Sequence, residues 1–294
     1  MKANTGCSLE RRSKSSGLYQ ETLNLLRQHH ILPKKRLGQN FTVDESLLQS
    51  VVNYADVEAK DTILEVGAGF GFLTRLLAPH VKKVLAVELD RNLITVLQSQ
   101  LSRFKNVQII PTDILTSNIT GFDKVLSTPP YSISSPLLFW LLEREFTLAV
   151  MTFQEEFARR LTADVGSRDY SRLTVAIYYR ADVELLEHVS KDCFYPSPDV
   201  DSIIVRVRPK PAPFKVNDEK AFNELVKTVF TQRNKKLRNA IMPYLLKYEI
   251  PKEKAQEMAD ALTFHDKRVR ELAPEDFGAL TNELVEKAHS LRRS

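Results

Sequence analysis

Cysteine is scarce in this chain, with only Cys7 and Cys193 among 294 residues. Small secreted domains that depend on disulfides carry many more cysteines, so the composition excludes a disulfide scaffold. The two cysteines lie far apart and form no CxxC or other metal-ligand spacing, so we expect no metal. Unpaired thiols suit a reducing compartment, and we therefore expect a cytoplasmic protein.

Long apolar runs are also missing. The longest, at 133–142 and 173–179, fall well short of the roughly 20 residues that cross a bilayer. The first residues are polar and basic and lack the apolar core of a secretory signal. We therefore expect no membrane partner. No heptad pattern or long apolar stripe stands out either, so a monomer is the default expectation.

Acidic side chains are few at the start of the chain. Residues 1–36 carry eight basic side chains against Glu10 and Glu21, a net +6, whereas the whole chain carries +5. A second basic cluster consists of Arg233, Lys235, Lys236 and Arg238. Concentrated positive charge on a near-neutral body is what binding to a phosphate backbone requires. A solvated tail, with residues 1–17 disordered, and one charged helix face would explain the same pattern.

Apolar runs that resemble buried strands alternate with helical patterns from residue 43 onward. The predicted strands are 62–66, 84–89, 107–110, 124–127, 148–153, 183–189 and 202–208. The predicted helices among them are 44–54, 71–78, 91–103, 135–145, 154–164 and 170–181, with a further helix at 18–30. The last two strands have no helix between them, which predicts an antiparallel hairpin at the sheet edge. The pattern indicates an α/β fold with a doubly wound, mostly parallel, seven-stranded Rossmann-like sheet.

Three prolines, at positions 209, 211 and 213, mark a domain boundary. Everything beyond them has helical periodicity, at about 218–232, 234–247, 251–262 and 274–288. We therefore predict a basic, partly disordered extension over 1–33, an α/β domain over 34–209 and a small helical domain over 210–294.

Glycine is also sparse, yet Gly67, Gly69 and Gly71 follow the first predicted strand and open a helix. Glycine permits a sharp turn there and lets the backbone pass close to a ligand. The dinucleotide-binding fingerprint would require glycine at position 72, where this chain has Phe72. The spacing therefore favours a ligand without a pyrophosphate, such as S-adenosylmethionine, over a nicotinamide cofactor.

Acidic residues follow the next two predicted strands. Glu88 ends the second strand, where a carboxylate can accept hydrogen bonds from two ribose hydroxyls. Asp113 follows the third strand and is placed to meet an adenine amino group. Strand, glycine turn, helix and acidic residue in this order favour an adenosyl ligand over an unrelated glycine-rich turn.

The fourth strand ends in a proline-rich turn, Ser-Thr-Pro-Pro-Tyr at 127–131. Pro129 and Pro130 donate no backbone hydrogen bonds, but their carbonyls still accept them. Such acceptors can hold an amino group, and Tyr131 offers a face on which a base can stack. The alternative is an ordinary turn after a strand. Its position on the same sheet edge as the glycine turn favours a functional role.

Together these segments resemble the ribosomal RNA adenine N6,N6-dimethyltransferases. The resemblance runs from about residue 34 to 280. It rests on the segments 35–41 (KRLGQNF), 65–71 (EVGAGFG), 88–90 (ELD), 112–114 (TDI), 154–161 (QEEFARRL), 170–175 (YSRLTV), 194–202 (FYPSPDVDS), 230–239 and 270–277.

The resemblance implies that residues 34–209 transfer methyl groups from S-adenosylmethionine to N6 of two adjacent adenosines. The substrate would be a hairpin loop of small-subunit rRNA, with residues 210–294 binding RNA and the enzyme acting in ribosome biogenesis. The implied cofactor-binding residues are Gln39, Asn40, Thr42, Gly67, Gly69, Glu88, Leu89, Asp113, Ile114 and Thr128. The implied RNA-binding residues are Lys34, Lys35, Arg36, Arg233, Lys235, Lys236 and Arg238.

The implied catalytic residues are Thr128, Pro129, Pro130, Tyr131 and Phe194. Tyr131 and Phe194 would sandwich an adenine that has left its stack. The alternative for Phe194 is a hydrophobic plug beneath the proline turn. The family normally has asparagine at position 128 and an aliphatic residue at 129, and a threonine hydroxyl is shorter and can donate as well as accept. We therefore expect methylation to persist, but weakly.

Two other functions remain open at this point. A methyltransferase of the same family could act on large-subunit rRNA. A non-catalytic RNA-binding assembly factor could keep the fold and the cofactor pocket, because fold alone does not fix function.

Overall fold

The structure is a computed structural model that describes residues 17–247 and 250–291. Residues 1–16, which hold most of the segment predicted to be disordered, lie outside the described residues. The described chain divides into two compact units, one within 1–158 and 183–209 and the other within 159–182 and 210–294. One junction follows Pro209, next to the predicted boundary, while residues 159–182 group with the second unit.

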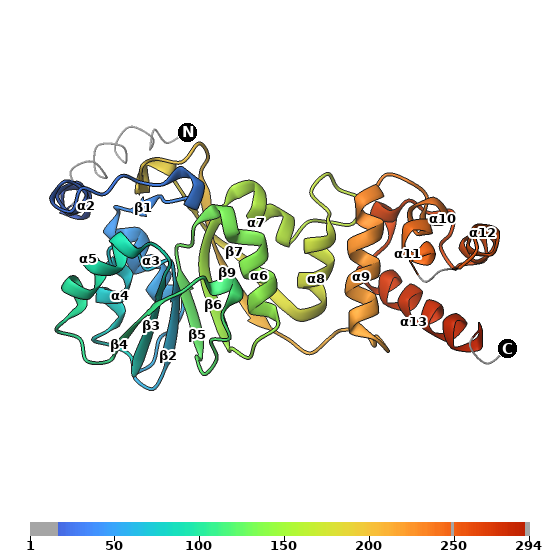
Figure 1. The fold of residues 1–294 in the computed structure, drawn as a ribbon, viewed down its shortest axis with the longest axis horizontal. Helices are drawn as coiled ribbons and strands as arrows, with labels where there is room; N and C mark the ends of the chain where they lie inside the picture. Colours follow the sequence, from blue (N-terminus) through green and yellow to red (C-terminus); the bar gives the residue numbers. More distant parts are fainter. Residues whose placement is uncertain (1–16, 248–249, 292–294) are drawn as a thin grey trace, which may run out of the picture. The chain divides into compact units, whose positions relative to one another are not determined.

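A seven-stranded sheet in the order β4-β3-β2-β5-β6-β9-β7 forms the centre of the first unit (Figure 1). The strands are β2 Thr62–Val66, β3 Lys83–Glu88, β4 Val107–Pro111, β5 Lys124–Ser127, β6 Leu148–Gln154, β7 Ala181–Val189 and β9 Ser202–Pro209. The neighbours from β4 to β6 run parallel, and β9 is antiparallel to β6. Because β3 and β6 are buried almost throughout, they consist mostly of apolar residues. The predicted α/β fold with seven strands is confirmed.

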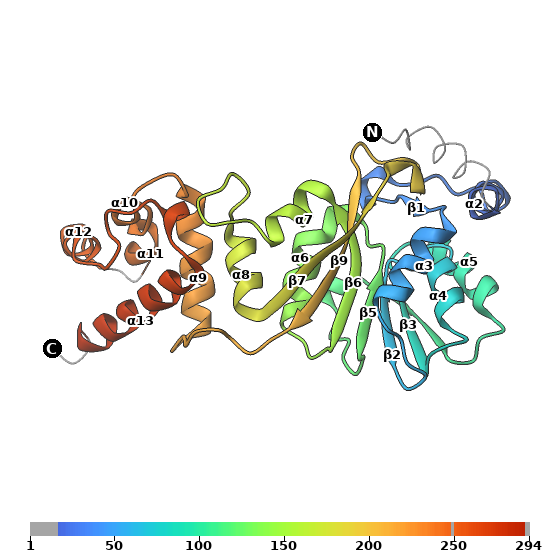
Figure 2. The same ribbon diagram turned by 180° about the vertical axis from the view of Figure 1, so that it is seen from behind.

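Helices cover the sheet of the first unit. They are α3 Glu45–Tyr54, α4 Phe72–Leu77, α5 Arg91–Leu101, α6 Ser134–Leu142 and α7 Glu155–Leu161, the last of which reaches the unit junction. Asp44 caps α3 by accepting a hydrogen bond from the amide of Leu47 at 3.0 Å, at the start of the helix predicted over 44–54. α3 packs against β5 and β6, on the side of the sheet seen in Figure 2.

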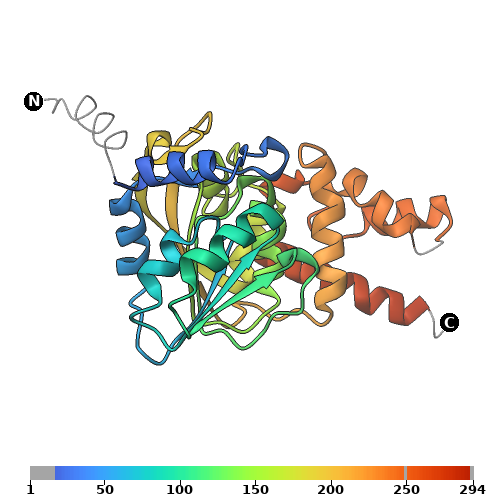
Figure 3. The ribbon, with the colours of Figure 1, turned by 60° about the vertical axis from the view of Figure 1, so that its left-hand side comes forward.

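The N-terminal helix α2, Gly17–Gln28, belongs to the first unit (Figure 3). Leu18, Leu25 and Leu26 are buried in the same apolar core as α3 and α4. Glu21 accepts two hydrogen bonds from Arg75 of α4, at 2.8 and 3.0 Å. Residues 17–28 of the predicted extension therefore form a helix that packs against the first unit.

A second sheet of only two strands was not foreseen. β1 Phe41–Thr42 pairs with β8 Phe194–Tyr195 in antiparallel register, Thr42 opposite Phe194. The amide of Val43 continues the pairing by donating to the carbonyl of Cys193 at 2.9 Å. Strands of two residues are too short to show any periodicity, so the sequence carried no signal for them.

The second unit is helical over the residues that the structure describes. Its helices are α8 Arg172–Arg180, α9 Glu219–Val229, α10 Leu237–Ala240, α11 Met242–Leu246, α12 Lys252–Asp260 and α13 Pro274–Leu291. Tyr170, Phe222 and Phe277 lie at the centre of its apolar core. The single helix predicted over 234–247 is wrong: α10 and α11 are separate. Pro243 stands in the first turn of α11 and has no amide hydrogen for a longer helix to use.

Six short 3-10 turns complete the chain as described. They are η1 Lys35–Leu37, η2 Ile114–Thr116, η3 Tyr131–Ile133, η4 Lys191–Cys193, η5 Phe230–Gln232 and η6 Val269–Glu271. Among the described helices, none combines the length and apolar character needed to span a membrane.

Candidate active site

The glycine turn after β2 and the proline turn after β5 contact each other directly. Gly67, Gly69 and Gly71 all have positive φ, at 76°, 56° and 81°, which strains any side chain larger than hydrogen. A Cβ atom at Gly67 would lie 2.9 Å from Cδ of Pro130. The two turns, which were predicted to lie on the same edge of the sheet, are therefore in van der Waals contact at its carboxyl edge.

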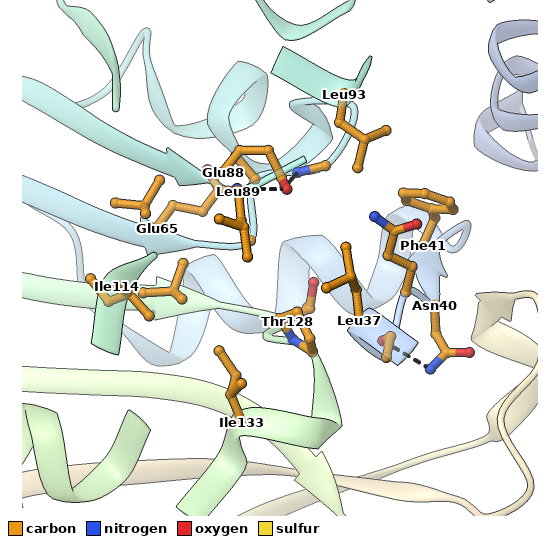
Figure 4. Close-up of a pocket in the computed structure, with 18 of the residues that line it drawn as sticks. Leu37, Asn40, Phe41, Glu65, Glu88, Leu89, Leu93, Ile114, Thr128 and Ile133 are labelled. Atoms are coloured by element: carbon orange, nitrogen blue, oxygen red, sulfur yellow. Dashed lines mark hydrogen bonds between the residues drawn. The ribbon is translucent and has the colours of Figure 1, made fainter. Parts of the chain in front are cut away.

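A cavity of about 270 Å³ opens at this edge (Figure 4). The glycine turn, the end of β3, the proline turn and the loop before β1 all contribute to its wall. All ten residues predicted to bind the cofactor line it: Gln39, Asn40, Thr42, Gly67, Gly69, Glu88, Leu89, Asp113, Ile114 and Thr128. The structure therefore brings together in one pocket residues from five separate segments of the sequence.

Glu88 is held rigidly at the side of the cavity. Its Oε2 accepts from the amide of Gly69 at 3.0 Å, and its Oε1 accepts from the amides of Leu89 and Asp90, each at 2.9 Å. Burial raises the pKa of Glu88, and these three hydrogen bonds only partly oppose that effect. A carboxylate has about four acceptor positions, so the group can still accept a bond from a ligand hydroxyl.

Glu65 also lines the cavity, and the sequence analysis assigned it no role beyond its place in the motif. Its side chain is buried and accepts a hydrogen bond from the hydroxyl of Thr74 at 2.5 Å. Burial raises the pKa of Glu65 to about 8. A carboxyl group inside a mostly apolar strand was the signal that could have identified Glu65 as a site residue. Acidic side chains are rarely fully buried unless they have a partner.

The loop that precedes β1 is fastened to the end of β3. Asp90 Oδ2 accepts from Lys34 Nζ at 2.7 Å and from Gln39 Nε2 at 2.9 Å, and Gln39 Oε1 accepts from the amide of Lys34 at 2.8 Å. Burial acts to raise the pKa of Asp90, but the bonds from Lys34 and Gln39 outweigh it and the pKa lies below its usual range. The amide group of Gln39 is therefore already used in holding the loop.

The other end of this loop meets the segment after the proline turn. Gly38 has a φ of 64°, and a Cβ atom there would lie 2.9 Å from Oγ of Ser132. Asn40 Nδ2 donates to the carbonyl of Gly38 at 3.3 Å. The loop therefore runs along the wall of the cavity from the acidic end of β3 to the proline turn.

Thr128 lies in the cavity wall, and the hydroxyl of Thr42 donates to its Oγ1 at 3.1 Å. Pro130 also lines the cavity, whereas Pro129, Tyr131 and Phe194 are not among the lining residues. The hydroxyls of Tyr131 and Ser202 are 2.7 Å apart, and burial raises the pKa of Tyr131 to about 12. Tyr131 therefore remains a neutral phenol at physiological pH.

Tyr131 and Phe194 contact each other and leave no gap for a base between them. Their ring centroids are 6.1 Å apart and the rings meet edge to face at 73°. The side chain of Phe194 is only 4% exposed and belongs to the core of the first unit. In this arrangement Phe194 is the plug beneath the proline turn that the alternative interpretation described, and a sandwiched adenine would require one ring to move.

Comparison with known proteins identifies the family. Residues 32–286 match the family described as ribosomal RNA adenine dimethylase. The chain belongs to this family. The match covers most of both units and begins after α2. The predicted family and its methyltransferase class are thereby confirmed.

Several relatives of this dimethylase family are similar along most of their length. A probable ribosomal RNA small subunit methyltransferase A from Methanosarcina acetivorans is 44% identical over 84% of this chain and 92% of its own. One of the same name from Methanopyrus kandleri is 39% identical over 82% of this chain and 88% of its own.

Solved structures agree with this fold. A dimethyladenosine transferase from Plasmodium falciparum aligns with a TM-score of 0.71 and 29% identity, over 83% of this chain and 97% of that one. The 23S rRNA methyltransferase ErmE aligns with a TM-score of 0.61 and 29% identity, over 84% of this chain and 100% of that one.

The basic residues predicted to bind RNA differ in their surroundings. Lys34 is paired with Asp90, while Lys35 and Arg36 are exposed. In the second unit Arg233 donates to the carbonyls of Arg168 and Ser167, at 2.9 and 2.8 Å. These bonds give Arg233 a structural role in addition to its charge.

The rest of the second basic cluster lies beside a segment that the sequence interpretation missed. Lys236 and Arg238 share Asp266, at 2.8 and 3.5 Å, and Lys235 is exposed. Backbone hydrogen bonds join residues 233–237 to residues 267–270. The latter carry the cations Lys267, Arg268 and Arg270. The two segments are about 30 residues apart in sequence, so no local pattern could show that they are neighbours.

No group of three or more histidine, cysteine, aspartate or glutamate side chains in the described residues is arranged to hold a metal ion.

Proposed function

We propose that this chain transfers methyl groups from S-adenosylmethionine to the N6 amines of two adjacent adenosines in small-subunit rRNA. The observation that carries the proposal is the contact between Gly67 and Pro130 at the rim of one cavity. It puts the predicted cofactor turn beside the predicted target turn. Methyl transfer needs this proximity, because donor and acceptor atoms must approach within about 3–3.5 Å.

The residues of the cavity fit S-adenosylmethionine. Glu88 retains acceptor capacity for the ribose hydroxyls, and Asp113 lies in the wall with only one oxygen used, by the amide of Leu115 at 2.9 Å. Leu89 is 51% exposed, so an apolar surface is available to an adenine ring. The positive-φ glycines allow a ligand to approach the backbone closely.

When bound, S-adenosylmethionine supplies a methyl group on a positively charged sulfur. The carbon–nitrogen bond forms as the carbon–sulfur bond breaks, sulfur keeps the electron pair, and the amine loses one proton to solvent for each methyl gained. The chain supplies alignment, which can contribute roughly 7–11 kcal/mol. Thr128 and the carbonyl of Pro129 would hold the amine and favour its charge-developing geometry.

Small-subunit rRNA is favoured as the substrate by the relatives. The archaeal proteins that are 39–44% identical are named for the small subunit. ErmE, named for 23S rRNA, is 29% identical. We include in the proposal a role in ribosome biogenesis, residence in the cytoplasm and action as a monomer.

Contact with the rRNA would come from exposed cations in both units. Lys35 and Arg36 are exposed in the first unit, and Lys235 is exposed in the second. Lysine and arginine bind phosphates with little regard for sequence, so these residues would set affinity and salt dependence. The base itself would be selected at the proline turn.

The experiment that tests the proposal is labelled-methyl transfer to unmethylated small and large ribosomal subunits, followed by mass analysis of the nucleosides. We expect N6,N6-dimethyladenosine in the small subunit alone. Glu88→Ala is the control, because it removes the carboxylate at the ribose position. Label in the large subunit would instead support the ErmE-like alternative. Binding to small subunits without any transfer would support the non-catalytic assembly factor.

A further inference from the structure

The hydroxyls of Thr42 and Thr128 form a pair at the wall of the cavity. Oγ1 of Thr42 donates to Oγ1 of Thr128 across 3.1 Å, and the two residues are 86 positions apart in sequence. Thr42 is 7% exposed, so its hydroxyl has little access to water. Thr128 is partly exposed at the cavity wall, so it is the hydroxyl of Thr42 that would lose its partner if the bond broke.

This bond changes what Thr128 can do. A threonine hydroxyl has one proton and two acceptor positions, and its side chain can rotate among three staggered states. The proton of Thr42 occupies one acceptor position of Thr128 and favours the rotamer that receives it. One acceptor position and the proton of Thr128 remain. Accepting one hydrogen bond also polarises the hydroxyl and makes its own proton a stronger donor.

Thr42 is itself fixed by the two-stranded sheet. In β1 it stands opposite Phe194 of β8, and the next residue, Val43, donates its amide to the carbonyl of Cys193 at 2.9 Å. Phe194 in turn contacts Tyr131, three residues beyond Thr128. Two contacts therefore connect the proline turn to the two-stranded sheet. The hydrogen bond from Thr42 to Thr128 connects it to β1, and the aromatic contact between Tyr131 and Phe194 connects it to β8.

We propose that Thr42 is a positioning residue that acts through Thr128, holding its hydroxyl in the orientation that receives the exocyclic amine of the target base. This inference rests on the proposed function. It assigns Thr42 to the target side of the reaction, whereas the sequence placed it among the cofactor-binding residues.

The test compares Thr42→Val, Thr42→Ser and Thr147→Val with the parent chain. Valine keeps the shape of threonine without its hydroxyl, whereas serine keeps the hydroxyl. Thr147 is an exposed matched control whose hydroxyl donates to the carbonyl of Asp123 at 2.9 Å, outside the cavity. For each variant, single-turnover methyl transfer is measured at saturating S-adenosylmethionine, affinity for S-adenosylhomocysteine is measured by calorimetry, and the melting temperature is recorded.

We expect Thr42→Val to slow transfer by about tenfold, the usual effect of one lost hydrogen bond, with unchanged affinity for S-adenosylhomocysteine. Thr42→Ser should recover most of the rate, and Thr147→Val should match the parent. In a Thr128→Ala background, Thr42→Val should cause no further loss, because its effect passes through Thr128.

Three results would overturn the inference. The first is a parental rate in Thr42→Val, and the second is an undiminished loss in the Thr128→Ala background. The third is a loss confined to S-adenosylhomocysteine affinity or to melting temperature, which makes Thr42 a cofactor ligand or a purely structural residue. A parent chain that methylates neither subunit would instead refute the proposed function, and this inference with it.

Discussion

Two features meet at position 128. The hydroxyl of Thr128 is held by a hydrogen bond, and threonine replaces the asparagine that the family resemblance implies at this position. The hydroxyl of Thr128 already accepts a bond from Thr42, so it offers a target amine only one acceptor position. An asparagine carbonyl at this position would extend further from the backbone and offer two. The threonine therefore fits a slow transfer better than a fast one.

Replacing Thr128 by asparagine should therefore raise the rate of methyl transfer. We expect a gain of on the order of tenfold or more, because a single well-placed polar contact in a transition state typically contributes about 100-fold. The measurement is single-turnover transfer to small subunits, with the ratio of monomethyl to dimethyl adenosine as a second readout. Thr128→Val, which removes the hydroxyl, should be slower than the parent. The absence of any gain with asparagine would count against a catalytic role for position 128.

The buried carboxyl of Glu65 should make stability depend on pH. Its pKa is about 8 in the folded chain, against 4.5 for an unperturbed glutamate. Between these values the folded state keeps a proton that the unfolded state has lost. The free energy of unfolding therefore falls as pH rises from about 4.5 to about 8, and it levels off above that.

Glu65→Gln should flatten this dependence, because glutamine resembles the protonated acid and does not titrate. The difference in unfolding free energy between variant and parent should grow in favour of the variant by roughly 1.4 kcal/mol per pH unit within this window. Denaturant titrations at several pH values measure it. Parallel curves for the two proteins would show that Glu65 titrates normally.

At the level of single elements, the loop before β1 forms part of the cavity wall and is held in place by the ion pair between Lys34 and Asp90. The side chain of Asp90 is only 2% exposed. Its Oδ1 accepts from the amide of Asn92, and its Oδ2 depends on Lys34 and Gln39 for its partners. Breaking a charged hydrogen bond of this kind costs about 1.5–3 kcal/mol. The loop would then lose its fixed position along the wall of the cavity.

Lys34→Met should therefore weaken binding of S-adenosylhomocysteine by on the order of tenfold, since the apolar stem is kept and only the charge is lost. Lys35→Met is the matched control, because Lys35 is an exposed neighbour of the same type. Calorimetry measures both affinities. Should Lys34→Met lose affinity for small-subunit RNA and keep its cofactor affinity, Lys34 would be the phosphate contact that the sequence predicted.

The large elements could be predicted because each has its own periodic signal. Buried strands such as β6 are mostly apolar runs, and Asp44 marks the start of α3 with a cap. The two-residue strands β1 and β8 arise from tertiary pairing, which leaves no periodic trace. The break between α10 and α11 lies beside Pro243, a local signal that the apolar periodicity alone does not contain.

The same distinction applies to the site. The lining of the cavity could be predicted from motifs, because glycine and acidic residues at strand ends are local features. Three other features depend on partners far away in sequence: the engagement of Lys34 by Asp90, the pairing of Thr42 with Thr128, and the burial of Phe194 against Tyr131. Residues 267–270 beside the second basic cluster belong with these features.

For the molecule as a whole, each unit has its own apolar core, and the cavity belongs entirely to the first. Cofactor affinity and much of the RNA affinity should therefore respond to different substitutions. Cations of the second unit should affect RNA binding without changing affinity for S-adenosylhomocysteine. Among these cations, a comparison of Lys235 with Arg233 can distinguish the effect of a positive charge on RNA binding from the effect of a structural hydrogen bond.

Lys235 is exposed, whereas the guanidinium of Arg233 holds the carbonyls of Ser167 and Arg168. Lys235→Ala should weaken binding to small-subunit RNA and reduce the slope of log affinity against log salt by about 0.7–0.9, the contribution of one phosphate contact. Its melting temperature should not change. Arg233→Ala should lower the melting temperature as well, because two carbonyls lose their donor. Binding titrations at several salt concentrations and thermal melts measure these effects. An unchanged salt slope in Lys235→Ala would make this cluster a solvated helix face and leave RNA binding to other residues.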